Sequence, residues 1–111
     1  MRPVFHVSTP ENVRVVAAKV RNPLGDATVE TDAIGIVLDR GDAVARLHRD
    51  SKLVDDLREL GAEGVALKAC SNAAEHPDVS RSDLLDGVEV VPSGVSEFTR
   101  LQANGYAYIR L

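Results

Sequence analysis

The sequence of 111 residues contains one cysteine, no tryptophan, two phenylalanines and two tyrosines. A single cysteine cannot form an internal disulfide, and His6, His48 and His76 are not spaced as zinc ligands, so neither a disulfide framework nor a metal site is indicated. No apolar run approaches the length of a membrane span, and the first residues are interrupted too soon for a signal peptide. We therefore expect a cytoplasmic protein with no metal, cofactor or membrane segment.

Lysine is also scarce, since three lysines stand beside ten arginines and ten aspartates, and the formal net charge is -4. An acidic, lysine-poor composition is typical of proteins from a high-salt cytoplasm and favours a halophilic archaeon, although a high-GC bacterial genome would favour the same residues. There is no run of basic residues and there are few aromatic ones, so the sequence lacks the pattern of a nucleic-acid-binding protein. Neither nucleic acid nor membrane is expected as a partner.

The remaining composition is that of one small globular domain. With 44% hydrophobic residues, the chain can bury a single core without disulfides or metals. Short apolar runs alternate with helical patterns in the order βαβαβαβαβ, which predicts one α/β domain over residues 1–111, with a mostly parallel five-stranded sheet and helices on both faces. The expected strands cover residues 4–7, 28–38, 65–69, 88–91 and 106–109.

Capping residues and apolar spacing predict the helices of the first half. Thr9 caps a helix with an apolar stripe that ends at Val20, and the proline and glycine of residues 22–26 stop it. A short helix is expected over residues 41–47, and Ser51 is expected to cap a longer one. These helices would connect the first three strands.

The helical signals of the second half are shorter. Residues 71–76 predict one helical turn, and residues 80–83 resemble a capping box that would begin a short helix. Ser93 is the expected cap of the last helix. The residues of this last helix expected to point inward are Val95, Phe98 and Leu101.

Cys70 follows the third expected strand directly. In an open parallel sheet, ligands bind beyond the carboxyl ends of the strands, and the N-terminus of a following helix favours the anionic thiolate. A reactive Cys70 is therefore one interpretation. The other is a buried and inert thiol, because free cysteine is among the residue types most often buried. Its position alone does not decide between them.

The loops at the strand ends are expected to gather small and polar residues around Cys70: Ser8 and Thr9, Arg40 and Gly41, Ser71 and Asn72, and Ser93 and Gly94. Helices that begin there would point N–H groups at an anion such as a thiolate or a persulfide. Each residue also has a structural interpretation, since the hydroxyls can cap helices, the glycines can serve turns and Arg40 can be solvated. Asn72 either hydrogen-bonds the sulfur or holds its loop in an Asx-turn.

Other polar side chains offer weaker candidates. His6 could act as a base, but it lies within the first strand, where packing against a neighbouring strand or subunit is the commoner role. Lys68 shares a strand face with Cys70 and either raises the local positive potential or extends into solvent. Tyr106 and Tyr108 fit a subunit contact on an edge strand.

Four segments together resemble the DsrE/DsrF-like family, in its short, stand-alone and largely uncharacterised branch. They are FHV at residues 5–7, VALKACSN at 65–72, GVEVVPSGV at 87–95 and LQANGYAYI at 101–109. The resemblance spans nearly the whole chain and implies a YchN-like α/β fold, assembled as a homotrimer or a larger homo-oligomer such as a hexamer. It also implies that Cys70 occupies the position of the cysteine that carries persulfide sulfur between proteins in sulfur-relay members.

The sequence departs from the relay proteins in two ways. It has no second cysteine, so sulfur on Cys70 would leave by attack of a thiol from another molecule, such as a sulfur-relay partner. Ser71 stands where related sequences often have a glycine, although its hydroxyl could still donate to the sulfur.

Three functions stay open at this point. The first is a persulfide-carrying sulfur-transfer or thiol-redox protein with Cys70 as nucleophile, a sulfur carrier or an enzyme resembling a sulfurtransferase. The second is a non-catalytic oligomeric module that binds or regulates through the same edge of the sheet. The third is a structural subunit of a larger assembly.

Overall fold

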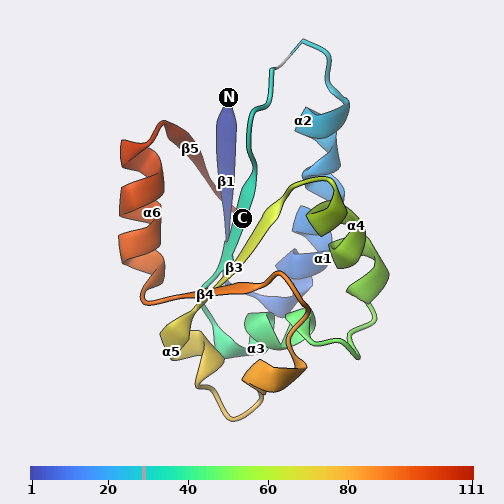
Figure 1. The fold of residues 1–111 in the computed structure, drawn as a ribbon, viewed down its shortest axis with the longest axis vertical. Helices are drawn as coiled ribbons and strands as arrows, with labels where there is room; N and C mark the ends of the chain where they lie inside the picture. Colours follow the sequence, from blue (N-terminus) through green and yellow to red (C-terminus); the bar gives the residue numbers. More distant parts are fainter. Residues whose placement is uncertain (29) are drawn as a thin grey trace.

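Figure 1 shows the computed structural model of the protein, which describes residues 1–28 and 30–111. Five strands form one sheet in the order β4-β3-β2-β1-β5, and every neighbouring pair is parallel. The strands are β1 (Arg2–Val7), β2 (Gly35–Leu38), β3 (Ala66–Cys70), β4 (Glu89–Val91) and β5 (Tyr106–Arg110). The predicted α/β architecture is confirmed, and four of the five strands begin and end within two residues of their expected bounds.

Helices cover both faces of the sheet (Figure 1). They are α1 (Pro10–Lys19), α2 (Arg21–Gly25), α3 (Gly41–Val44), α4 (Val54–Ala62), α5 (Ser71–Ala74) and α6 (Gly94–Ala103), with 3-10 turns at Ala45–Leu47 and Arg81–Asp83. In Figure 1, α6 lies alone on one side of the sheet, while α1 and α4 lie on the other. The radius of gyration, 13.0 Å, is that of one compact domain of this length.

The larger apolar core lies between the sheet and the helices α1, α3 and α4. Successive residues of a strand point to opposite faces, so every second side chain of the inner strands enters this core. Its members include Phe5, Val7, Val13, Val16, Ile36, Leu38, Val44, Leu57, Leu60, Leu67 and Ala69. All four residues of β2 are buried, as expected for a central strand.

The opposite face has a much smaller apolar cluster beneath α6. It consists of Val4, Val37, Phe98 and Leu101, with Tyr106 packed against it. The same face also carries His6 and Lys68, because both alternate with core residues along their strands. The polar side chains are therefore concentrated on the face that α6 covers.

Two of the predicted helix caps are confirmed. Thr9 Oγ1 accepts the backbone N–H of Asn12 at 3.3 Å at the start of α1. Ser93 Oγ accepts the N–H of Ser96 at 3.2 Å at the start of α6. Each bond satisfies an N–H group that has no partner within the helix.

The second strand is shorter than the expected residues 28–38, since β2 spans only its last four residues. Val29 falls outside the described residues. The first residue of β2 pairs with Ala66, the first residue of β3, and the chain before Ala66 forms the turn that ends α4, with Gly64 at φ 92. No neighbouring strand is therefore present on this side to extend β2 toward its N-terminus.

Two helix boundaries also differ from the prediction. Residues 22–26 do not stop the chain in a plain turn, because most of them form α2. Ser51 accepts the N–H of Leu53 at 3.2 Å, but the helix itself begins only at Val54.

The predicted capping box at residues 80–83 is wrong. The hydroxyl of Ser80 lies 3.1 Å from that of Ser82 and caps no helix, and only a 3-10 turn forms. The chain leaves the turn at Leu84, which makes an antiparallel bridge with His48. This bridge ties the segment to the loop after α3 and ends the helical turn.

The orientation of α6 was predicted incorrectly at one position. Phe98 and Leu101 point inward as expected, but Val95 is 79% exposed. Glu97 is 1% exposed instead, because it forms an ion pair with Lys68 of β3 beneath the helix. The ion pair with Lys68 thus turns the side of α6 that carries Glu97 toward the sheet.

Candidate functional site

The carboxyl ends of the strands meet at one edge of the sheet, and we call this edge the rim. Ser8 follows β1, Asp39 follows β2, Cys70 ends β3 and Gly94 follows β4. A β-carbon added to Gly94 would lie 3.5 Å from the β-carbon of Asp39 and 4.0 Å from that of Cys70. Asp39, Cys70 and Gly94 therefore lie close together at this edge, and Asp39 is not among the predicted site residues.

Cys70 is the last residue of β3, and α5 begins at the next residue, Ser71. Its side chain is buried, with 7% of the residue exposed, and it borders the larger core. On its other side lies Gly94, the first residue of α6, which has no side chain to cover the sulfur. The thiol thus sits at the boundary between the core and the rim.

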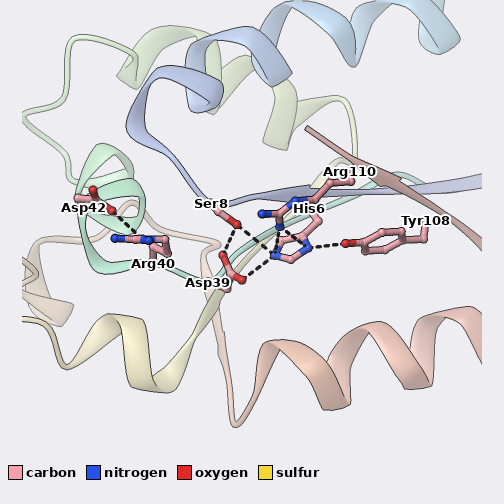
Figure 2. Close-up of polar contacts among 7 residues, drawn as sticks. All are labelled: His6, Ser8, Asp39, Arg40, Asp42, Tyr108 and Arg110. Carbon is pink, nitrogen blue, oxygen red and sulfur yellow. Dashed lines mark hydrogen bonds and ion pairs between the residues drawn. The ribbon is translucent and has the colours of Figure 1, made fainter.

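A chain of polar contacts runs across the strands beside Cys70 (Figure 2). Asp39 Oδ2 lies 2.6 Å from Nε2 of His6, and Oδ1 of the same carboxylate accepts the Ser8 hydroxyl at 2.8 Å. His6 Nδ1 lies 2.6 Å from the hydroxyl of Tyr108 on β5. Because a carboxylate only accepts, Nε2 of His6 donates to Asp39, and Nδ1 lies within hydrogen-bond distance of the Tyr108 hydroxyl.

The Asp39 carboxylate is held in its ionised form. Its partial burial acts to raise the pKa, but the hydrogen bonds donated by His6 and Ser8, together with the charge interactions with His6 and Arg110, outweigh it and hold the Asp39 pKa below its ordinary value. A negative charge therefore faces the rim next to Cys70 near neutral pH.

Arg110 approaches the His6 ring from β5. Its Nη1 atom lies 2.8 Å from each of the two ring nitrogens. Both nitrogens are already engaged by Asp39 and Tyr108, so the guanidinium packs on the ring rather than forming two further hydrogen bonds. The ring of Phe98 on α6 lies 4.5 Å from the imidazole, between ring centroids. His6 is thus enclosed on several sides and has a fixed orientation.

A second part of the rim forms a cavity of about 550 Å³ between the loop after β2 and the loop after α5. Three predicted site residues line it, namely Arg40, Gly41 and Asn72. A β-carbon at position 41 would overlap the side chain of His76, so the glycine is needed for this close approach. Cys70 does not line this cavity.

The other predicted site residues have structural contacts. Ser71 Oγ accepts a hydrogen bond from Arg81 at 3.0 Å, and Ser93 caps α6. Arg40 is exposed and lies 3.8 Å from Asp42 in an ion pair. Within residues 1–28 and 30–111, no hydrogen bond joins Asn72 to the Cys70 sulfur.

Lys68 does not extend into solvent as one of its two interpretations proposed. It lies between two carboxylates, in an ion pair with Glu97 and 3.7 Å from Glu89. Arg100 forms a further ion pair with Glu97. Glu97 and Glu89 therefore compensate the positive charge of Lys68. This cation contributes little positive potential to the rim near Cys70.

Sequence reasoning missed the roles of Asp39, Tyr108 and Arg110. Asp39 had a detectable signal, because it follows directly after a buried strand at the edge where ligands bind. Tyr108 and Arg110 share a strand face by their spacing of two, but nothing in the local pattern shows that β5 pairs with the strand that carries His6.

The described residues include neither a metal-binding cluster nor a membrane-spanning helix. Among the residues that the structure describes, no three histidine, cysteine, aspartate or glutamate side chains are grouped so that they could hold a metal ion. The described helices include none that is both long and apolar enough to cross a membrane.

The fold and the rim define an α/β protein with its single cysteine at the carboxyl edge of a parallel sheet. Residues 31–111 match the model of the DsrE/DsrF-like family, so the chain belongs to this family. Among solved structures it is similar to MTH1491, a protein of unknown function from Methanobacterium thermoautotrophicum, with 38% identity and a TM-score of 0.86, over 99% of this chain and 98% of the other. No curated protein matches the chain. The family membership and the fold agree with the resemblance seen in the sequence.

Proposed function

We propose that the protein carries sulfur on Cys70, as a persulfide, in transfer or thiol-redox exchange with other proteins in the cytoplasm. The observation that carries the proposal is the place of Cys70, at the end of β3 on the rim, between the core and the glycine that begins α6. Membership of the DsrE/DsrF-like family supports a role related to sulfur transfer.

The exchange needs no group other than the thiol and its partners. The Cys70 sulfur attacks the outer sulfur of a donor persulfide, R–S–S–H, and a new S–S bond forms. The donor S–S bond breaks, and R–S–H leaves with the proton that the Cys70 thiol gave up. A second thiol then attacks the outer sulfur of the Cys70 persulfide in the same way and restores Cys70. Since the chain has one cysteine, this second thiol belongs to another molecule, such as a sulfur-relay partner.

The helix that begins at Gly94 favours this chemistry. An N-terminus of a helix carries about half a positive charge, which stabilises an anionic sulfur nearby. Gly94 also leaves space over the thiol, where any other residue would place a β-carbon 4.0 Å from that of Cys70. His6, Ser8 and Asp39 form the polar side of the same site.

The direct test is the intact mass of the protein after reaction with a large excess of polysulfide, followed to completion at high ionic strength to screen charge. We expect a gain of whole sulfur atoms that a reductant removes and that Cys70→Ser, folded by circular dichroism, does not show. An unmodified Cys70 in folded protein would contradict the proposal.

The cavity favours a second function, that of a non-catalytic module that binds a ligand through the rim. It has a volume of about 550 Å³ and is lined by Arg40, Gly41 and Asn72 but not by Cys70. A module of this kind would still bind its ligand in the Cys70→Ser variant. A persulfide carrier with the same substitution would no longer transfer sulfur.

We also propose a homo-oligomer, a trimer or a hexamer. The edge strand β5 exposes Tyr108 and Ile109, and α6 exposes Val95. Exposed apolar side chains on the edge strand of a sheet are typical of a subunit contact. Light scattering at low and high salt should give a multiple of the chain mass, and a monomer under both conditions would contradict this assembly.

A further inference from the structure

The glycine beside Cys70 carries an inference about the sulfur species that the site accepts. We infer that Gly94 determines the specificity of Cys70: the site takes the terminal sulfur atom of a persulfide and excludes disulfides, in which each sulfur carries a carbon chain. This inference rests on the proposed function of Cys70. It narrows that function from thiol-redox exchange in general to the transfer of single sulfur atoms.

The backbone does not require a glycine at position 94. Gly94 is the first residue of α6, and the Ser93 side chain caps the helix. Within the described part of the chain, the glycines with positive φ are Gly64, Gly87 and Gly105, so the backbone at Gly94 is one that any residue adopts. Alanine also has a higher helix propensity than glycine. Local conformation therefore does not account for this glycine.

Packing does not require a glycine there either. A β-carbon at position 94 would lie 3.5 Å from the β-carbon of Asp39, 4.0 Å from that of Cys70 and 4.0 Å from Cε2 of Phe98. Separations of about 3.5–4.0 Å are the optimal contact distances between carbon atoms. Position 41 is the contrast, because a β-carbon there would overlap the side chain of His76. An alanine fits at position 94 and does not fit at position 41.

The missing β-carbon leaves a space of about one methyl group next to Cys70. Asp39, Phe98 and Cys70 bound this space. Gly94, Phe98 and Cys70 are all buried, so the space is closed on most sides and not a wide opening to solvent. A divalent sulfur atom is about as large as a methyl group. The space therefore fits one added sulfur atom and leaves no room for a carbon chain bonded to that atom.

Persulfides and disulfides differ at the sulfur that a thiol attacks. The outer sulfur of R–S–S–H carries only hydrogen besides its leaving group. When the Cys70 sulfur attacks it, the protein gains one sulfur atom, and R–S–H leaves with the proton of the Cys70 thiol. Attack on R–S–S–R′ would bond R–S to Cys70 and release R′–S–H, so the chain R would have to enter the space beside Gly94.

The size of the effect follows from the cost of excess volume in a packed site. One methylene group in a closely fitting pocket changes a rate by about 10- to 200-fold. A disulfide brings at least one carbon more than a persulfide to the attacked sulfur. We therefore expect the folded protein to favour the persulfide by at least about tenfold, once the intrinsic reactivity of each donor is taken into account.

The test compares two donors with the same chain, the persulfide of 2-mercaptoethanol and bis(2-hydroxyethyl) disulfide. Initial rates of modification of Cys70 are followed by intact mass, and each is divided by the rate for the same chain unfolded in urea, where access is unrestricted. We expect the normalised rate for the persulfide to exceed that for the disulfide by at least about tenfold. Equal normalised rates would overturn the inference.

Gly94→Ala fills the space without changing the chemistry of the thiol. We expect sulfur gain from the persulfide to slow by at least about tenfold, with an unfolding midpoint in urea no lower than that of the wild type. Gly61→Ala is the matched control, since this helical glycine of α4 has nothing within 4 Å of an added β-carbon, and it should leave the rate unchanged. An unchanged rate in folded Gly94→Ala would overturn the inference. If Gly94→Ala does not fold, the comparison of the two donors in the wild type decides.

The proposed function and its size limit can fail separately. If Cys70 gains sulfur from the persulfide and reacts equally well with the disulfide, the carrier function stands and the size limit fails. If Cys70 gains no sulfur, the carrier function fails, and the size limit is then measured with methyl and benzyl methanethiosulfonate. Each reagent transfers its thioalkyl group to the Cys70 sulfur and releases methanesulfinate. A higher normalised rate for the methyl reagent would support the size limit beside Gly94, and equal rates would overturn it.

Discussion

Along β2, side chains alternate between two different environments. Ile36 and Leu38 point into the apolar core beneath α1, α3 and α4, whereas Val37 points toward α6 and Asp39 follows on the same side. The face beneath α6 also carries His6 and Lys68. The two faces share the same strands, yet one is apolar and the other combines a small apolar cluster with charged and hydrogen-bonded groups.

The two faces of the sheet therefore have different roles, one in stability and the other in positioning the groups near Cys70. Buried apolar area supplies most of the free energy of folding, so the larger core is expected to hold the sheet together. The polar groups beneath α6 contribute less net stability, because each loses contact with water when it is buried. They hold α6, and with it Gly94, in place over the rim. Substitutions on the apolar face should lower the stability of the fold. Substitutions on the face beneath α6 should change the surroundings of Cys70.

The largest loss of stability is expected from truncation of the apolar face. Ile36→Ala removes a fully buried side chain and leaves a cavity, which should lower the free energy of unfolding by about 2–5 kcal/mol. Urea unfolding measures the change. Leu24→Ala, on the exposed helix α2, is the control and should cost less than about 1 kcal/mol. Equal losses for the two variants would contradict the assignment of stability to the larger core.

An intermediate loss is expected when the buried charge beneath α6 is removed. Glu97→Leu leaves Lys68 with only Glu89 as a partner, and we expect the free energy of unfolding to fall by about 2–3 kcal/mol. The double variant with Lys68→Met should recover most of this loss, because the charges that then lack a partner, those of Glu89 and Arg100, are exposed to solvent. Urea unfolding of both variants tests this, and a double variant no more stable than the single one would show that packing, not charge, decides the cost.

The fold was largely predictable because its signals are local. Alternating apolar runs gave the strands, and Thr9 and Ser93 marked two helix starts through the hydrogen bonds that they later form. The excess length of the second strand shows the limit of such reasoning. Residues before β2 have the composition of a strand, but a strand also needs a neighbour, and the turn after α4 offers none on that side.

The site was predictable only in part, because its contacts join residues far apart in sequence. The position of Cys70 at a strand end was visible from the apolar run before it. The contact from His6 to Tyr108 depends on the order of the strands, which local patterns do not encode. Glu97 was not among the residues of the last helix expected to point inward, because its partner Lys68 lies 29 positions away and charged residues are rarely buried without a partner.

The smallest of the three stability effects concerns Asp39 and its dependence on pH. Folding lowers the pKa of this carboxyl through its bonds with His6 and Ser8, so its stabilising effect is present above the unfolded pKa of about 3.9 and is lost as the pH falls through the lower folded value. Since the group is partly exposed, we expect Asp39→Asn to cost only about 1 kcal/mol at pH 7.

This cost should begin to shrink below the unfolded pKa of about 3.9, because the carboxyl of the unfolded chain is protonated before that of the folded protein. Urea unfolding of both proteins at pH 7 and at pH 3 gives the comparison, and Asp42→Asn, exposed on α3, serves as the control with little change at either pH. A difference between wild type and Asp39→Asn that is the same at both pH values would mean that the ionised form of Asp39 does not stabilise the fold. The side chains around Asp39 would then be held in place by packing around His6 and not by the charge of the Asp39 carboxylate.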